Sequence, residues 1–226
     1  MKRLLLVALL GLVLSPELAH AQRRGRAKPI KLGLTFGAKA GLASTNITGG
    51  KQTGTVAVAF EQKVLPVVGA LANFRFTPQL SIQLEALYAP RGCTRQIVFP
   101  GGTRQEDKVR LNYVDVPVLL KFNQKIFYVE LGGVGSVLTS DKLTNANGKI
   151  IGKGLVNTLD IAYALGAGVE LEQGAFFGLR YVRSTSTIGQ GSNLYSYIDG
   201  LENTAIQLTG GYIFGHSGGR GRGRRR

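Results

Sequence analysis

The feature that most constrains this chain is a strict alternation of apolar residues with small or charged ones. In the clearest run, from Leu159 to Glu172, one face carries leucine, isoleucine, tyrosine, alanine and valine. The other face carries glycine, alanine, aspartate and glutamate. Successive side chains of a β-strand point to opposite faces, whereas a helix would not keep a two-residue period over so long a run. The run therefore predicts a strand with one apolar and one polar face.

The same alternation recurs along the chain and predicts eight strands. Their ranges are 32–43, 64–76, 80–90, 109–122, 126–138, 159–172, 176–187 and 203–215. Tight turns near 77–79, 123–125 and 173–175 alternate with long polar connections at 44–63, 91–108, 139–157 and 188–202. Short turns at one end and long loops at the other are typical of outer-membrane barrels. The predicted fold is all-β, an eight-stranded antiparallel up-and-down transmembrane β-barrel over residues 32–215. Pro117 lies within a predicted strand, where a β-bulge is expected.

The polar face of these strands is expected to line the barrel interior. The candidate lumen charge network is Lys39, Arg75, Glu85, Asp115, Lys121, Glu130, Asp160, Glu170, Glu172 and Arg180. Charges inside a narrow barrel have to pair and form hydrogen bonds to be tolerated. Eight strands leave an interior just wide enough for side chains to fill. We therefore expect a plugged lumen, and the alternatives are a small channel or a soluble lipocalin-like barrel that binds a ligand.

Glycine and aromatic residues fit the same prediction. Glycine makes up 32 of the 226 residues. The glycines within strands are expected where the backbone and the packed lumen approach closely. They are Gly37, Gly41, Gly69, Gly132, Gly166, Gly168 and Gly211. Aromatic residues beside the short turns predict an interfacial girdle on the periplasmic side. They are Phe74, Phe76, Phe122, Phe127, Phe176, Phe177, Tyr212 and Phe214.

The two ends of the chain differ from the body. A basic start, an apolar run over Leu4–Leu14 and the tripeptide Ala19-His20-Ala21 predict a secretory signal peptide at residues 1–21. A basic periplasmic arm follows at 22–31, and an Arg/Gly-rich tail that we expect to be disordered occupies 216–226. The basic tail residues are Arg220, Arg222, Arg224, Arg225 and Arg226. Because much of the positive charge lies in these ends and not on the body, nucleic acid is not the predicted partner.

Few residues are suited to catalysis or metal binding. Cys93 is the single cysteine, which excludes a disulfide framework, and His216 is the one histidine left after the predicted cleavage. His216 lies beyond the last predicted strand, so we predict no enzymatic activity, no metal site and no cofactor. Glu170 and Glu172 share a face, and their spacing does not exclude a glycosidase pair. A lumen network with Arg180 or Arg75 is the favoured interpretation of these two carboxylates.

Five segments carry a resemblance to a known family. The most specific is Leu111–Phe122, and the others are Phe36–Leu42, Leu84–Tyr88, Leu179–Tyr181 and Gly211–Phe214. Together they resemble the PorT-like proteins of the outer membrane β-barrel domain family, which is common in Bacteroidetes. The resemblance covers residues 33–215 and implies an eight-stranded barrel in the outer membrane, without implying an activity. The founding member is associated with a secretion and gliding apparatus.

The expected function is therefore a structural or binding role in the cell envelope of a Gram-negative bacterium, including docking in a larger secretion or envelope assembly. The expected partners are outer membrane lipid and, through the long loops, envelope proteins or an extracellular ligand. The protein is expected to be a monomer.

Overall fold

The computed structural model describes residues 33–52, 57–98, 104–145, 149–152, 157–186 and 198–214. The predicted signal peptide, the basic arm at 22–31 and the Arg/Gly-rich tail at 216–226, with its five arginines and His216, lie outside these residues. Within the described ranges, no helix is long and apolar enough to cross a membrane.

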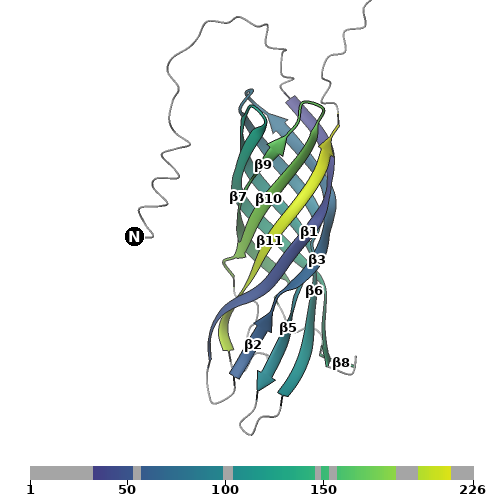
Figure 1. The fold of residues 1–226 in the computed structure, drawn as a ribbon, viewed down its shortest axis with the longest axis vertical. Helices are drawn as coiled ribbons and strands as arrows, with labels where there is room; N and C mark the ends of the chain where they lie inside the picture. The colour runs from purple at the N-terminus through teal and green to yellow at the C-terminus, as the bar shows by residue number, and fades with distance from the viewer. Residues whose placement is uncertain are drawn as a thin grey trace, which may run out of the picture.

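Eight antiparallel strands close into one ring (Figure 1). Each ring strand pairs with the next one along the chain, and the last pairs with the first, where Gly37 lies opposite Ile213. The ring is therefore an eight-stranded antiparallel up-and-down barrel, and the predicted fold is confirmed. The ring strands are β1 (Gly33–Gln52), β3 (Lys63–Arg75), β4 (Leu80–Tyr88), β6 (Arg104–Gln124), β7 (Phe127–Asn145), β9 (Leu159–Glu170), β10 (Ala175–Ser184) and β11 (Ile198–Ile213).

Three short strands lengthen the wall at the end of the ring away from Gly33 and the end of β11 (Figure 1). They are β2 (Ala57–Glu61), β5 (Arg91–Val98) and β8 (Ile150–Gly152). β5 continues β4 in an unchanged register along β6, from Leu80 opposite Phe122 to Val98 opposite Arg104. The expectation that 44–63, 91–108 and 139–157 are long loops was therefore wrong for much of their length. Backbone pairing continues through these polar stretches because hydrogen bonding between strands does not require an apolar face.

The outward side chains form an apolar belt around the ring. On β6 the belt runs from Val114 to Phe122, with both residues about two-fifths exposed, and Leu165 on β9 is 59% exposed. A strand that crosses the hydrocarbon of a membrane at a tilt needs about 9–11 residues, so this stretch of β6 matches one crossing. A soluble ligand-binding barrel would need the opposite orientation, with apolar side chains inside.

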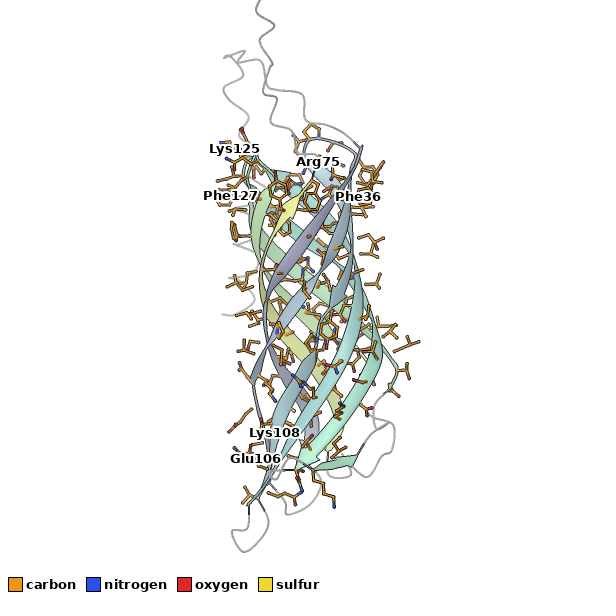
Figure 2. The ribbon with its side chains drawn as sticks, turned by 90° about the vertical axis from the view of Figure 1, so that its right-hand side faces the viewer. Phe36, Arg75, Glu106, Lys108, Lys125 and Phe127 are labelled. Carbon is orange, nitrogen blue, oxygen red and sulfur yellow. The ribbon has the colours of Figure 1, made fainter. Side chains whose placement is uncertain are left out.

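Exposed aromatic rings mark the edge of the belt near the short turns. Figure 2 shows Phe36 and Phe127 at this end, close to Lys125 and Arg75. Phe36 was not among the aromatics predicted here. Those predicted here and found exposed are Phe74, Phe76, Phe122, Phe127, Phe177, Tyr212 and Phe214. Phe176 is a correction, since it is only 2% exposed. Even-numbered residues of β10 face the lumen, so the ring of Phe176 points inward.

The β-bulge expected at Pro117 is also a correction. Pro117 lies opposite Val134 within a regular stretch of the β6–β7 ladder, and the register shift of that ladder falls between Asn112 and Tyr113. On the β4 side, the register is the same before and after the proline, and only the intervening pairs are missing. Proline lacks an N–H group and cannot donate a ladder bond. Its effect here is a gap in the ladder without a shift in register.

Candidate functional site: a layered charge network in the lumen

The barrel interior holds nine of the ten charged residues predicted to line it. Each of the nine is at most 9% exposed. They are Lys39, Arg75, Glu85, Asp115, Lys121, Glu130, Asp160, Glu170 and Arg180. Because the strands alternate faces, each of these side chains points inward while its apolar neighbours face outward. Their contacts form three layers along the barrel.

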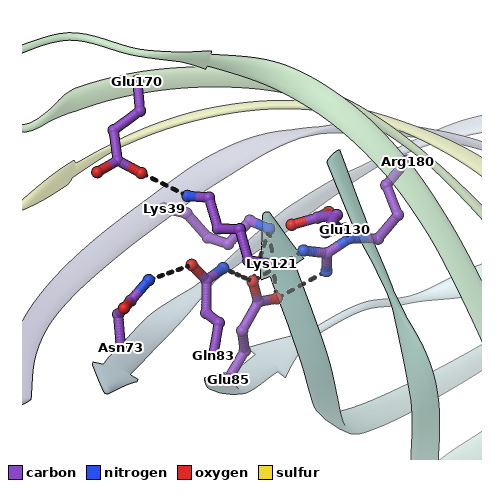
Figure 3. A network of polar contacts seen from close by, with 8 residues as sticks. All are labelled: Lys39, Asn73, Gln83, Glu85, Lys121, Glu130, Glu170 and Arg180. Atoms are coloured by element: carbon purple, nitrogen blue, oxygen red, sulfur yellow. Dashed lines mark hydrogen bonds and ion pairs between the residues drawn. The ribbon is translucent and has the colours of Figure 1, made fainter. Parts of the chain in front are cut away.

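The central layer is centred on Glu85 and Arg180 (Figure 3). Arg180 donates from Nη1 and Nη2 to the two oxygens of Glu85, at 2.7 and 2.9 Å, and from Nε to Glu130 at 2.7 Å. Lys39 Nζ lies 3.2 Å from Glu85 Oε1, which also accepts from the amide of Gln83 at 2.6 Å. This bidentate pairing is the strong, geometrically specific form of an arginine–carboxylate contact. It joins β10 to β4 across the lumen.

The second layer lies nearer the short turns. Glu170 accepts from Arg75 at 2.7 Å and from Lys121 at 2.6 Å. The Lys121 ammonium also lies 3.9 Å from the ring centroid of Tyr128 and 5.7 Å from that of Phe176. Cation–π contacts strengthen when the cation is removed from water, and here the aromatic rings surround a buried lysine.

Glycines make room for these two rings. A Cβ at Gly168 would lie 2.6 Å from Cζ of Tyr128, and one at Gly211 would lie 2.7 Å from Cε1 of Phe176. Real Cβ atoms do not approach other heavy atoms so closely. These positions on β9 and β11 face the lumen, so the glycine-rich inner face accommodates the aromatic part of the network.

The third layer lies toward the long hairpins and is built on Arg91. Its guanidinium donates to Asp115 at 2.9 Å, to Asp160 at 2.6 Å and to Ser136 at 2.9 Å, and it lies 4.6 Å from the ring centroid of Tyr113. Asp160 accepts further hydrogen bonds from Ser184 at 2.7 Å, Ser186 at 2.5 Å and Asn203 at 3.4 Å. Both carboxylates of this layer are thus held by one arginine and a shell of hydroxyl and amide groups.

Two residues differ from the sequence prediction. Glu172 lies exposed in the turn between β9 and β10, because β9 ends at Glu170 and the alternation stops there. Arg91 was missed because residue 91 was assigned to a loop, whereas β5 places its side chain in the lumen at 4% exposure. The predicted set held more acids than bases, and that imbalance was the signal for a missing cation. With both corrections, the three layers contain five basic and five acidic side chains.

The wall turns inward at the level of the third layer. Ala89, Arg91 and Cys93 are buried, and so are Pro90 and Gly92 on the alternate face. Thr45 of β1 places its hydroxyl oxygen 2.9 Å from the carbonyl oxygen of Gly92 and accepts from the Gly92 N–H at 3.3 Å. β5 therefore packs against the inner face of β1, which narrows the interior at this level.

The carboxylates of the three layers are bonded to cations, hydroxyls and amides and do not converge on a common point. In the described part of the chain, no group of three or more histidine, cysteine, aspartate or glutamate residues could hold a metal ion. The glycosidase alternative required Glu170 and Glu172 to act together. Glu170 is bonded to Arg75 and Lys121 inside the barrel, whereas Glu172 lies outside it.

Solved structures include barrels similar to this one at low sequence identity. Ail, the attachment invasion locus protein of Yersinia pestis, is 14% identical with a TM-score of 0.45, over 81% of this chain and 100% of that chain. OprG from Pseudomonas aeruginosa is 15% identical with a TM-score of 0.47, over 82% of this chain and 97% of that chain. Neisserial surface protein A is 11% identical with a TM-score of 0.47, over 80% of this chain and 98% of that chain.

Comparison with curated protein sequences found no match. The sequence profile described as "Outer membrane protein beta-barrel domain" matches residues 20–188. That match covers most of the chain and contains seven of the eight ring strands. The chain therefore belongs to the outer membrane protein β-barrel domain family.

Proposed function

We propose that this protein is a non-enzymatic outer membrane barrel with a plugged lumen, which serves a structural or binding role in the cell envelope. The observation that carries the proposal is the layered network of five cations and five anions that crosses the interior. In a charge-neutral, hydrogen-bonded network each charge is paired within the network. Such a lumen needs no bound solute and no permeating ion to neutralise it. The contact between Thr45 and Gly92 supports closure at the outer end.

The alternatives have less support. A channel needs an open path, whereas Glu85 and Arg180 are in direct contact across the interior. A lipocalin-like protein needs an apolar interior, whereas the apolar belt lies outside. An enzyme needs a reactive constellation, whereas the lumen carboxylates are neutralised by arginine and lysine.

The binding form of the proposal concerns the end with the long hairpins. There β5, β6 and β7 extend past the apolar belt, so they present polar surface beyond the membrane. In this form, the protein docks within a larger secretion or envelope assembly through these hairpins. Exposed hairpins on a rigid scaffold are the usual location of such contacts.

Conductance in a planar lipid bilayer tests the plugged lumen. The purified mature chain is expected to give no stepwise conductance. An opened variant, in which Glu85, Arg180, Arg91 and Asp115 are all changed to alanine, removes two cations and two anions without changing net charge and is expected to conduct. The matched control changes Lys125 and Glu172, both exposed at turns, to alanine and is expected to stay closed. Steady conductance of the unmodified protein, equal to that of the opened variant, would refute the proposal.

A further inference from the structure

Three basic side chains lie together on the outer surface of β6 and β7. Arg110 on β6 lies directly opposite Lys142 on β7, and Lys108 is the next outward residue along β6. All three are exposed. Figure 2 shows Lys108 at the end of the barrel away from Phe36 and Phe127. We call these three residues the outer basic patch.

The patch is electrostatically unfavourable by itself. Like charges directly opposite on neighbouring strands destabilise a sheet. Among the described residues, none of the three forms an ion pair with a carboxylate. The nearest acid on the outward face of β6 is Glu106, on the far side of Lys108 from Arg110. Elsewhere on the wall the arrangement differs, because Arg183 on β10 donates to Glu202 on β11 at 2.8 Å.

The distance of the outer basic patch from the apolar belt indicates which part of the membrane contacts it. Val114 on β6 is the last residue of the apolar belt toward the long hairpins, and Arg110 lies four residues farther toward the hairpins, before Val114 in the chain. Four residues of strand span about 13 Å, or roughly 10 Å along the membrane normal at a tilt of about 40°. The polar layer of a membrane begins immediately outside the hydrocarbon. Because short turns mark the periplasmic side, this is the outer leaflet.

We propose that the outer basic patch binds the phosphorylated sugar headgroup of an outer-leaflet glycolipid. Arg110 offers a planar fork of donors suited to phosphate, and Lys108 and Lys142 add charge on either side. A phosphorylated headgroup beside the wall relieves the repulsion between Arg110 and Lys142. A lipid is the occupant because the patch adjoins the belt, where lipid already surrounds the barrel. The proposal does not depend on whether the lumen conducts.

The test uses the mature chain folded in nanodiscs of zwitterionic phospholipid. The probes are diphosphorylated lipid A, the same lipid A without phosphates, and inorganic phosphate. Retained lipid A is counted by native mass spectrometry, and barrel stability is measured as the temperature at which gel mobility changes. The test variant is Arg110→Gln with Lys142→Gln. The control variant, Lys125→Gln with Arg183→Gln, removes two positive charges elsewhere on the surface.

The unmodified chain and the control are expected to retain diphosphorylated lipid A and to gain thermal stability from it. The test variant is expected to bind about tenfold more weakly or worse, because it loses charge-assisted hydrogen bonds. Without lipid A, the test variant is expected to be at least as stable as the unmodified chain, since the repulsion is gone. A merely structural role for the two cations predicts a loss of stability instead.

Three results would each overturn the proposal. The first is equal binding of lipid A by the test variant and the unmodified chain. The second is equal binding of the dephosphorylated lipid A, which would show that its acyl chains are recognised. The third is that inorganic phosphate alone reproduces the whole gain in stability, which would make the patch a site for small anions.

Discussion

Replacing Arg180 by methionine tests whether the lumen network holds the barrel together. The Arg180 side chain is 3% exposed and contributes charge-assisted hydrogen bonds of 2.7 and 2.9 Å to Glu85 and 2.7 Å to Glu130. Methionine is unbranched and uncharged, so the change removes the cation and keeps the packing of the aliphatic stem. Glu85 keeps Lys39 and Gln83. Glu130 keeps no other ion pair among the residues that the structure describes.

The expected loss of stability follows from the Glu130 carboxylate, which is left buried without its cation. Breaking a buried ion pair by removing one partner costs about 3–5 kcal/mol, because the remaining charge is left in the interior. We therefore expect Arg180→Met to lower the free energy of unfolding by about 3–5 kcal/mol. Adding Glu130→Gln restores equal numbers of cations and anions within the three layers. We expect the double variant to lose only about 1–2 kcal/mol, because a neutral amide is less costly to bury than an unpaired carboxylate.

The assay is urea unfolding, in lipid vesicles, of the chain without its predicted signal peptide. Unfolding is followed by gel mobility and far-ultraviolet circular dichroism, because the chain contains no tryptophan for fluorescence. The decisive comparison is between the single and double variants. If Arg180→Met lowers stability by less than about 1 kcal/mol, the network is not a major source of stability. If the double variant is less stable than the single variant, the stranded carboxylate of Glu130 is not the cause.

Three further results are expected. Glu170→Gln should lower the free energy of unfolding in urea by about 2–4 kcal/mol, because two buried cations lose their carboxylate. Glu172→Gln should change it by less than about 0.5 kcal/mol, and equal effects would contradict the placement of the two residues. Gly168→Ala should lower the melting temperature because its Cβ meets the Tyr128 ring, whereas Gly133→Ala, which meets nothing within 4 Å, should leave it unchanged or raise it. Cys93, fully buried, should resist a maleimide reagent in the folded barrel and react fully once heated, and rapid labelling of the folded chain would show an open interior.

Much of the architecture followed from the two-residue period. In a strand this period assigns each side chain to one of two faces without reference to any other strand. Lys39, Glu85 and Arg180 could be placed inside, and Phe36 and Leu165 outside, from local pattern alone. The period does not show where a strand ends. Extending the period therefore placed Glu172 on the inner face, although β9 ends at Glu170. The period also did not reveal that β5 continues β4 in the same register along β6.

Local sequence is enough to predict amphipathic antiparallel strands with charge on the inner face. Alternation assigns each side chain to a face, and turn residues mark where the chain reverses. Which charges form pairs depends on the closed barrel. Glu85 and Arg180 are 95 positions apart, as are Arg75 and Glu170, and both pairs form because closure of β11 on β1 brings opposite walls within reach. The contact of Arg91 on β5 with Asp160 on β9 likewise joins strands that are not neighbours in the ring. Contacts across a lumen depend on the stagger and closure of the whole ring, which no single segment encodes.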